Sequence, residues 1–341
     1  LILIIMMVLV WFVILFVSLA VLVMAADKFT DYAEKFGKFL KLPNFIIGVL
    51  ILAVGTSLPE LATSIMGVRQ GEVEFLSGNV IGTVIVNMLL GLGIAVLFTR
   101  KKAKFNWDII DNDLPFFAAS IFLVVIALFD GVFSFVEALI FLAGYIIYVI
   151  YAYQIQKDEK ESAKKELKDQ LKKEIKQDIE QAKTGKFMKK IFSPEAKTLF
   201  FMLIALAFVV LASKYVVDAV IVLADIFGLG TSVIAATAVA LGTSLPEILV
   251  AISAARRGNF DMVIGDILGS NIFDVFVIYG VCGLFTTLTI SMDLYMTLIP
   301  FLVGTFFLLW LVLIDKKITK TEGLLFVLIY VMFLGKLFKV F

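Results

Sequence analysis

A hexapeptide that carries a carboxylate occurs twice in the chain, each time within a long apolar run. The sequence Gly-Thr-Ser-Leu-Pro-Glu ends at Glu60 in the run 44–68 and at Glu247 in the run 230–255. An ionisable side chain at membrane depth costs at least about 2.5–3.5 kcal/mol, so by default it marks a functional position. Carboxylate oxygens are ligands of hard cations such as Ca²⁺. The chemistry that the two glutamates indicate is the binding of a desolvated metal cation.

The proline before each glutamate predicts where main-chain ligands come from. Pro59 and Pro246 each remove a helical hydrogen bond and clash with the carbonyl four residues back. Each hexapeptide should therefore break a helix, with the serine as N-cap of the second half and the glutamate three residues after it. The break leaves free carbonyls at the depth of the carboxylate. A plain proline kink beside a water-filled crevice is the alternative, and two identical copies favour an ion site over it.

The similarity between the two copies continues in the next apolar segment. Thr83 and Asn87 follow the first hexapeptide at the same spacing as Ser270 and Asp274 follow the second. Residues four apart share one helix face. Glycines at 78/82 and 265/269 form small-xxx-small faces, which permit close helix packing. The polar pairs could simply form hydrogen bonds between helices, but their repetition beside the glutamates favours a role at the ion site.

Composition restricts the class of protein and the chemistry of its site. The 341 residues are 61% hydrophobic, which predicts an integral membrane protein in contact with the lipid bilayer, and the net charge of +1 gives no excess for nucleic-acid binding. There is no histidine and only one cysteine, Cys282, so zinc, copper and haem sites are disfavoured and no cofactor is expected. An intramembrane enzyme lacks a nucleophile–base pair or metal motif. A cation channel would usually depend on an oligomeric pore ring.

Hydropathy predicts an all-α polytopic protein with about ten transmembrane helices, since one span needs about 20 apolar residues. The candidate segments are 2–24, 44–68, 77–98, 113–129, 132–153, 198–223, 230–255, 262–287, 294–314 and 322–340. Between the fifth and sixth lies a charged, lysine-rich stretch with leucine and isoleucine at four-residue spacing. The predicted organisation is a first repeat at 1–153, a linker helix at 154–197 and a second repeat at 198–341. A regulatory or lipid-headgroup role is the alternative for the linker.

Lysine and arginine predict the orientation of the chain. They gather in the odd-numbered connections, including the central one, which predicts that these are cytoplasmic and that both termini face outside. Five spans is an odd number, so the two hexapeptides lie in halves of inverted topology, with broken helices at the repeat interface. The short central loop favours a prokaryotic plasma (inner) membrane over an organelle. The sequence makes no prediction of oligomeric state.

The paired hexapeptides and the packing segments resemble the calcium/cation antiporter superfamily, in particular its sodium/calcium exchanger branch. The resemblance implies a secondary active antiporter that exchanges Ca²⁺ for Na⁺ by alternating access. It implies Ca²⁺ ligands from the side chains of Glu60 and Glu247 and the main chain of Thr56 and Thr243. It further implies Na⁺ ligands and flanking groups at Ala53, Ser57, Thr83, Asn87, Ala240, Ser244, Ser270 and Asp274. One departure is Val84, because many members have an asparagine there, as this chain does at the second-copy position, Asn271.

The chemistry of the residues agrees with that reading and addresses the coupling ion. Two glutamates neutralise one Ca²⁺, whereas an empty site would leave two bare anions in the membrane, which disfavours crossing without cargo. H⁺/Ca²⁺ exchange needs only carboxylates, and the repeated hydroxyls would then have no task. Sodium requires such neutral oxygens, and the third carboxylate, Asp274, allows up to three Na⁺ to be neutralised. Sodium is therefore favoured, with H⁺/Ca²⁺ exchange and K⁺-dependent Na⁺/Ca²⁺ exchange as the alternatives.

Overall fold

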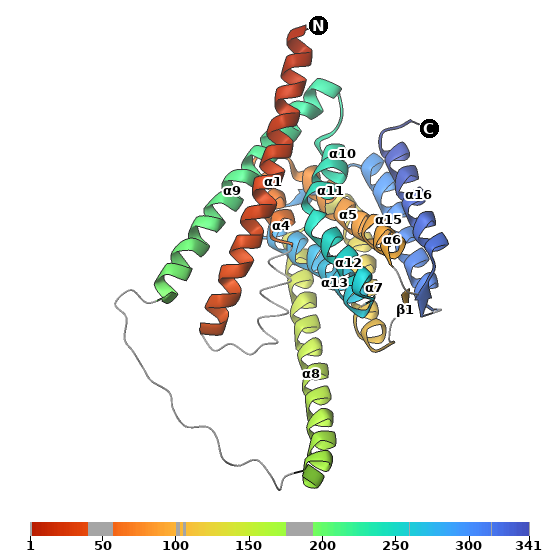
Figure 1. Cartoon of the computed structure of the whole chain (residues 1–341). Coiled ribbons are helices and arrows are strands. Elements are labelled where there is room, and N and C mark those ends of the chain that lie inside the picture. Colours follow the sequence, from red (N-terminus) through yellow and green to blue (C-terminus); the bar gives the residue numbers. More distant parts are fainter. Residues whose placement is uncertain are drawn as a thin grey trace.

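The computed structural model describes residues 2–39, 57–99, 103–104, 107–174, 194–258, 260–314 and 316–340, which are almost entirely helical (Figure 1). The first half contains α1 (Ile2–Phe39), α4 (Leu58–Arg69), α5 (Val73–Val86), α6 (Leu92–Phe98), α7 (Trp107–Ala127) and α8 (Phe135–Glu174). The second half contains α9 (Pro194–Phe227), α10 (Thr231–Ile234), α11 (Ala240–Thr243), α12 (Leu245–Arg257), α13 (Phe260–Phe273), α14 (Tyr279–Gly283), α15 (Met292–Ile314) and α16 (Lys320–Leu337). Three π-helical turns lie within these helices, namely η2 (Asn87–Gly91), η3 (Ala235–Val239) and η4 (Asp274–Ile278).

The helices are those of a membrane protein. In the described part of the chain, six helices are long and apolar enough to cross a membrane, or seven if the bent pair 231–243 and 245–257 forms one span. The other predicted spans coincide with α4, α7 and α16, which are shorter or carry more charge. For the segment 44–68, only the second part lies within the described residues. The prediction of a helical membrane protein is confirmed, whereas the count of ten spans stays a prediction.

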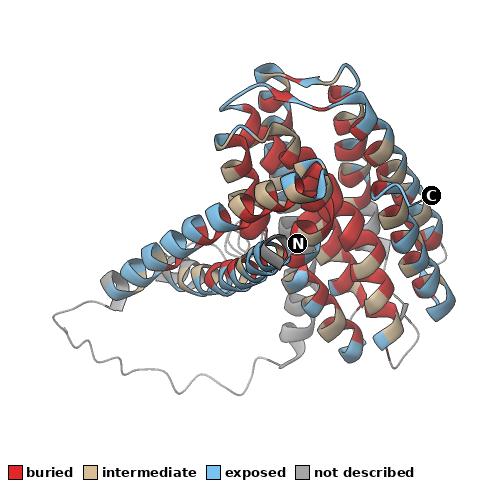
Figure 2. Cartoon of the chain, turned by 90° about the horizontal axis from the view of Figure 1, so that it is seen from above, coloured by how far each residue is buried: buried red, intermediate tan, exposed pale blue. Residues whose placement is uncertain are grey.

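The molecule has buried central helices and lipid-accessible outer ones (Figure 2). The most apolar stretch of Val73–Phe98 is 83% buried and that of Phe260–Gly283 is 72% buried, against 22% for Ile5–Tyr32 in α1. Helices α1 and α9 lie side by side and bury a common apolar seam, which includes Leu15, Leu22, Val216 and Val220. Their outer faces expose large apolar side chains. Exposed apolar surface of this extent suits contact with lipid.

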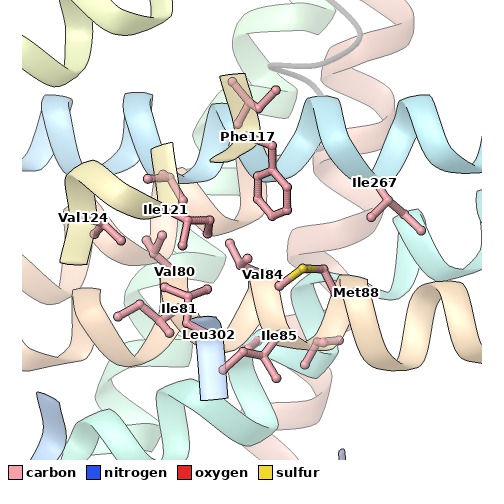
Figure 3. Packing of buried hydrophobic residues seen from close by; sticks show 14 of the residues in the cluster. Val80, Ile81, Val84, Ile85, Met88, Phe117, Ile121, Val124, Ile267 and Leu302 are labelled. Carbon is pink, nitrogen blue, oxygen red and sulfur yellow. The ribbon is translucent and has the colours of Figure 1, made fainter. Parts of the chain in front are cut away.

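Helix α5 is the centre of the main hydrophobic core. Val80, Ile81, Val84, Ile85 and the adjoining Met88 are all buried, because apolar side chains surround this helix on several sides. Figure 3 shows them among side chains from three other helices, namely Phe117, Ile121 and Val124 of α7, Ile267 of α13 and Leu302 of α15. The helix that carries Thr83 is therefore held rigidly in position.

The glycines of α5 allow it to touch the other half of the molecule at backbone distance. A Cβ atom on Gly78 would lie 2.3 Å from the Ser232 carbonyl oxygen, and one on Gly82 would lie 2.6 Å from the Ala236 Cα. The small-xxx-small prediction is thus confirmed for this pair. Its partner is the α10–η3 segment, the first part of the broken helix in the second repeat. The two repeats therefore meet main chain to main chain directly beside the hexapeptides.

We expect Gly82→Ala to lower the stability of the folded protein by about 1–3 kcal/mol, because the added methyl group forces α5 away from η3. Thermal unfolding in detergent measures the loss. Gly304→Ala is the matched control, since Gly304 in α15 has open space where the Cβ would lie and alanine favours a helix. Equal stability of the Gly82→Ala protein and the wild type would contradict this account of the helix contact.

Two short antiparallel sheets connect segments that are far apart in the sequence. Strand β1 (Ala103–Lys104) pairs with β4 (Lys317–Ile318), and β2 (Val132–Phe133) pairs with β3 (Leu288–Thr289). Strand β3 follows β1 at the same distance along the sequence as β4 follows β2. The strands β3 and β4 are therefore the second-repeat equivalents of β1 and β2. The paired residues are equivalent too, since Leu288 corresponds to Ala103 and Ile318 corresponds to Phe133, and the pairs are Ala103–Ile318 and Phe133–Leu288. The two sheets are therefore counterparts of each other under the internal repeat.

The same relation applies to the helix starts that follow the strands. Ser134 and Glu137 form reciprocal side-chain to main-chain hydrogen bonds at the start of α8, with 2.6 Å from Ser134 N to Glu137 Oε2. Thr319 and Glu322 form the same capping box at the start of α16, also with 2.6 Å between the corresponding atoms. Sequence analysis found only hydropathy in these later spans. The structure extends the repeat to them.

Candidate functional site

The second hexapeptide breaks its helix as predicted. Helix α11 ends at Thr243, Ser244 forms a turn, and α12 begins at Leu245 with Pro246 in its first turn. The two helical parts are bent by 45°. The break follows from the proline, which cannot continue the hydrogen-bond ladder of the preceding helix. For the first hexapeptide, α4 begins at Leu58, directly after Ser57, while the preceding part lies outside the described residues.

The predicted N-cap positions of the two serines are confirmed, but their hydroxyls do not act as caps. Ser57 and Ser244 occupy the N-cap positions of α4 and α12, but neither side chain makes the capping hydrogen bond. Both hydroxyl oxygens are buried, and neither has a hydrogen-bond partner among the described residues. The main-chain carbonyl of each serine accepts the first hydrogen bond of its helix, from Leu61 N to Ser57 at 3.1 Å and from Ile248 N to Ser244 at 3.0 Å. The serine hydroxyls thus remain available for another ligand.

The predicted site residues are buried wherever the structure describes them. Ten of the twelve lie within the described residues, and each has at most 4% of its surface exposed: Ser57, Glu60, Thr83, Asn87, Ala240, Thr243, Ser244, Glu247, Ser270 and Asp274. Ala53 and Thr56 lie outside the described residues. Such depth is unusual for acids and hydroxyls, which are costly to bury unless they find a partner.

The two repeats contribute to one shared cluster. Thr243 of the second repeat lies beside the Glu60 carboxyl group of the first. Ser57 of the first repeat lies beside the Asp274 carboxyl group of the second, without the geometry of a hydrogen bond. Glu60 and Asp274 both act electrostatically on Glu247. The structure therefore brings three acids from both repeats near hydroxyl groups of both hexapeptides.

Oxygen atoms without a hydrogen-bond partner are concentrated in this cluster. In the described part of the chain, these are the two serine hydroxyls, both carboxyl oxygens of Glu60 and Asp274, one of Glu247, the Thr83 hydroxyl and the Asn87 side-chain carbonyl. Leaving a buried acceptor unsatisfied costs about 1–3 kcal/mol, and more for a charged group. A desolvated cation bound among these oxygens would satisfy them together.

The other two hydroxyls of the cluster donate to the main chain. Thr243 Oγ1 donates to Val239 O at 3.0 Å, and Ser270 Oγ donates to Asp266 O at 2.8 Å. Donation uses the hydrogen and leaves the oxygen lone pairs free for a cation. Within the described residues, no group of three or more acid, histidine or cysteine side chains is arranged to hold a metal ion. The acids alone are therefore not arranged as a metal site there, and an ion bound in the cluster would need hydroxyl oxygens as well.

The π-helical turns were not expected from the sequence. Turn η2 begins at Asn87 and η4 begins at Asp274, the equivalent positions of the two repeats. Asn87 Nδ2 donates across the repeat interface to Asn271 Oδ1 at 3.1 Å. π-Turns occur frequently at functional sites, since they widen the helix by one residue. Here they mark the central polar residue of each repeat.

Sequence analysis also missed Asn79, which holds the first broken helix in place. Its Nδ2 atom lies 2.9 Å from Ser64 Oγ, 3.2 Å from Thr63 Oγ1 and 3.3 Å from the main-chain oxygen of Glu60. It is fully buried. The signal in the sequence was its position four residues before Thr83, on the face that also carries Asn87. Asn79 positions the backbone that carries Glu60.

Comparison with known proteins finds relatives along almost the whole chain. The family profile described as "Sodium/calcium exchanger protein" matches residues 10–154 and 197–339. The chain is 32% identical over 353 aligned positions to the sodium/calcium exchanger MaX1 of Methanosarcina acetivorans, with 96% of this chain and 99% of that protein covered. It is 27% identical to the inner membrane protein YrbG of Escherichia coli, with 80% and 79% covered.

Solved structures agree with this grouping. The structure of the sodium-calcium exchanger NCX_Mj soaked with 2.5 mM Na⁺ and 0.1 mM Sr²⁺ superimposes with a TM-score of 0.59 at 27% sequence identity. The match covers 95% of this chain and 98% of that one. The match therefore spans both repeats.

Proposed function

Because the chain belongs to the sodium/calcium exchanger protein family, we propose that it is a secondary active antiporter that exchanges Ca²⁺ for Na⁺ by alternating access. Membership of this family makes it a membrane transporter for cation and calcium exchange and not an enzyme. The observation that carries the finer proposal is the buried meeting of Glu60 and Glu247 with unpartnered oxygens from both repeats.

Calcium binding requires both glutamates. Ca²⁺ takes six to eight oxygen ligands, and two carboxylates neutralise its charge in a low-dielectric interior. Main-chain oxygens of Thr56 and Thr243 complete the proposed calcium set. Thr243 lies beside Glu60, which supports a site shared by the two repeats.

Sodium binding uses the neutral oxygens around the same carboxylates. The proposed ligands are the hydroxyls of Ser57, Ser244, Thr83 and Ser270 and the main-chain oxygens of Ala53 and Ala240, with Asn87 and Asp274 in the middle. A dehydrated Na⁺ ion carries one charge, so its attraction to a carboxylate is weaker than that of Ca²⁺. It therefore needs several neutral oxygen ligands to replace its water. The hydroxyls of Ser57, Ser244 and Thr83 have no hydrogen-bond partner in the ranges that the structure describes, which supports this role.

Exchange, as opposed to leak, follows from the cost of the empty cluster. Without a cation, the carboxyl groups of Glu60, Glu247 and Asp274 would share a buried space, and like charges at short range oppose one another strongly. The change between the two access states is therefore disfavoured when the site is empty. Bound Ca²⁺ or bound Na⁺ neutralises the carboxylates and allows that change. This charge balance couples the two fluxes.

Inverted repeats provide the two access states in this proposal. The β1–β4 sheet joins the connections after spans 3 and 9, and the β2–β3 sheet joins those after spans 4 and 8. Each sheet thus links two connections that charge places on the same side, cytoplasmic for the first sheet and external for the second. This pairing supports two five-span halves of opposite orientation, a cytoplasmic 154–197 tether and external termini. A plasma-membrane location is part of the same proposal.

Opposite orientation predicts the result of a labelling experiment. Cysteines that replace Arg69 and Arg256, which are exposed at equivalent ends of α4 and α12, should react with a membrane-impermeant maleimide from opposite sides. Cys282 is buried and is first replaced by alanine. Labelling of both positions from the same side would exclude inverted topology.

The coupling ion is tested in proteoliposomes that contain the purified protein. Calcium uptake is measured under an outward gradient of Na⁺, K⁺ or H⁺, one at a time, with the membrane potential clamped. We expect uptake with the sodium gradient alone. Uptake with a proton gradient and no sodium would replace the sodium proposal with H⁺/Ca²⁺ exchange, and a requirement for K⁺ beside Na⁺ would indicate K⁺-dependent exchange.

A further inference from the structure

One position on the packing helices differs in charge between the repeats. Asn79 in α5 corresponds to Asp266 in α13, each four residues before the hydroxyl residue of its helix. Asn79 donates to the main-chain oxygen of Glu60 and to the side chains of Thr63 and Ser64. An ionised aspartate has no hydrogen to donate. Asp266 therefore cannot repeat the structural role of Asn79.

The surroundings of Asp266 also lack the partners that Asn79 has. The positions that correspond to Thr63 and Ser64 are Val250 and Ala251, whose side chains form no hydrogen bonds. The Oδ2 atom of Asp266 is buried and has no hydrogen-bond partner in the described part of the chain. The two arginines at the end of α12 are engaged elsewhere, Arg257 with the Ser253 hydroxyl and Arg256 over the Phe98 ring. Within the described residues, the Oδ2 atom of Asp266 therefore has no compensating partner.

Asp266 lies on the helix that carries Ser270 and leads to Asp274 of the cluster. It shares a helix face with Ser270 and Asp274, and each step of four residues advances about 6 Å along the axis. Its charge acts on Glu247. Helix α13 begins at Phe260, after the connection that charge predicts to be cytoplasmic. Asp266 thus lies between that end of the helix and the cluster.

We propose that Asp266 attracts cations from the cytoplasm and passes them to Glu247, a role that its neutral counterpart Asn79 does not perform on the external approach. The proposal rests on the proposed exchange function and on the predicted orientation. An unpaired negative charge in a partly dehydrated path raises the local cation concentration, and its effect is greater for Ca²⁺ than for Na⁺ because the attraction scales with ion charge. The two sides of the transporter would then differ in apparent affinity for calcium.

The test compares half-saturation on the two sides in proteoliposomes of defined orientation. We expect Asp266→Asn to raise the cytoplasmic half-saturation concentration for Ca²⁺ by on the order of tenfold, with a smaller rise for Na⁺. The external values and the maximal flux should stay within about twofold of the wild type, which also shows that the protein is folded. Asp266→Glu, which retains the charge, should preserve most of the cytoplasmic affinity. Asp130→Asn, in an exposed external turn, is the control for loss of a carboxylate elsewhere.

Two results would overturn the inference while the exchange function stands. Unchanged half-saturation of Asp266→Asn on both sides would mean that the charge of Asp266 has no effect on cation entry. Equal rises on both sides would mean that Asp266 supports the cluster itself and not one approach. A wild-type protein without any calcium flux would instead contradict the proposed function.

Discussion

Replacement of either Glu60 or Glu247 by glutamine should abolish calcium transport while the protein remains folded. Each change leaves one glutamate carboxylate for a doubly charged ion in a buried site. Removal of one partner from a buried charge pair costs about 3–5 kcal/mol, which corresponds to roughly a hundredfold loss of affinity or more. Isotopic calcium flux into proteoliposomes measures the effect. Near-normal flux in either variant would contradict the assignment of the paired glutamates.

The fold should survive these changes, because glutamine has nearly the same shape and removes a buried charge. Thermal unfolding in detergent tests this expectation. Glu322→Gln is a control of the same chemistry, since Glu322 caps α16 on the exposed surface, away from the cluster. Transport by this variant should equal that of the wild type. A fall in flux as large as in the two site variants would mean that glutamate loss acts through folding.

The second large effect is expected from the unpartnered serine hydroxyls. Ser57→Ala and Ser244→Ala each remove a neutral oxygen that we assign to sodium and leave the glutamates in place. Loss of such a ligand costs about 1–3 kcal/mol, so the half-saturation concentration for Na⁺ should rise roughly tenfold to a hundredfold. That for Ca²⁺ should change much less, because charge dominates its binding. Sodium-dependent calcium flux over a range of sodium concentrations gives both values.

Ser120→Ala is the matched control for this pair. Ser120 in α7 is fully buried, but its hydroxyl already donates to the Phe117 main-chain oxygen at 2.8 Å. Its loss should not alter the affinity for either ion. An equal loss of Na⁺ and Ca²⁺ affinity in Ser57→Ala and Ser244→Ala would show that these hydroxyls serve the whole cluster and not sodium in particular.

The broken helix was predictable because its cause is local. Proline cannot donate to the helical ladder, so the sequence alone predicts a break at Pro246, and the structure confirms it. The repeated polar residues were likewise predicted to lie at a shared site, and those such as Thr83 and Asp274 are buried in the structure. These conclusions need only sequence spacing and the cost of burying polar atoms.

Other features depended on contacts between distant segments and could not be derived from local pattern. The role of Asn79 requires α4 to lie against α5, and the partner of Gly82 is a residue of the other repeat. Two-residue strands are too short to leave a periodic signal. The π-turns at Asn87 and Asp274 follow no residue preference that a single sequence reveals. The serine N-cap positions were predicted from a common motif, but the motif does not reveal that neither hydroxyl makes the capping hydrogen bond.

The most direct test of the account is to follow both ions in the same proteoliposomes. Vesicles loaded with labelled Na⁺ are diluted into sodium-free buffer with or without external labelled Ca²⁺. The account predicts that sodium leaves only when calcium is present, that calcium enters in a fixed ratio to it, and that both fluxes vanish in Glu60→Gln. Sodium efflux without any external calcium, or calcium entry without internal sodium or another exchangeable cation, would contradict obligatory exchange at a shared site.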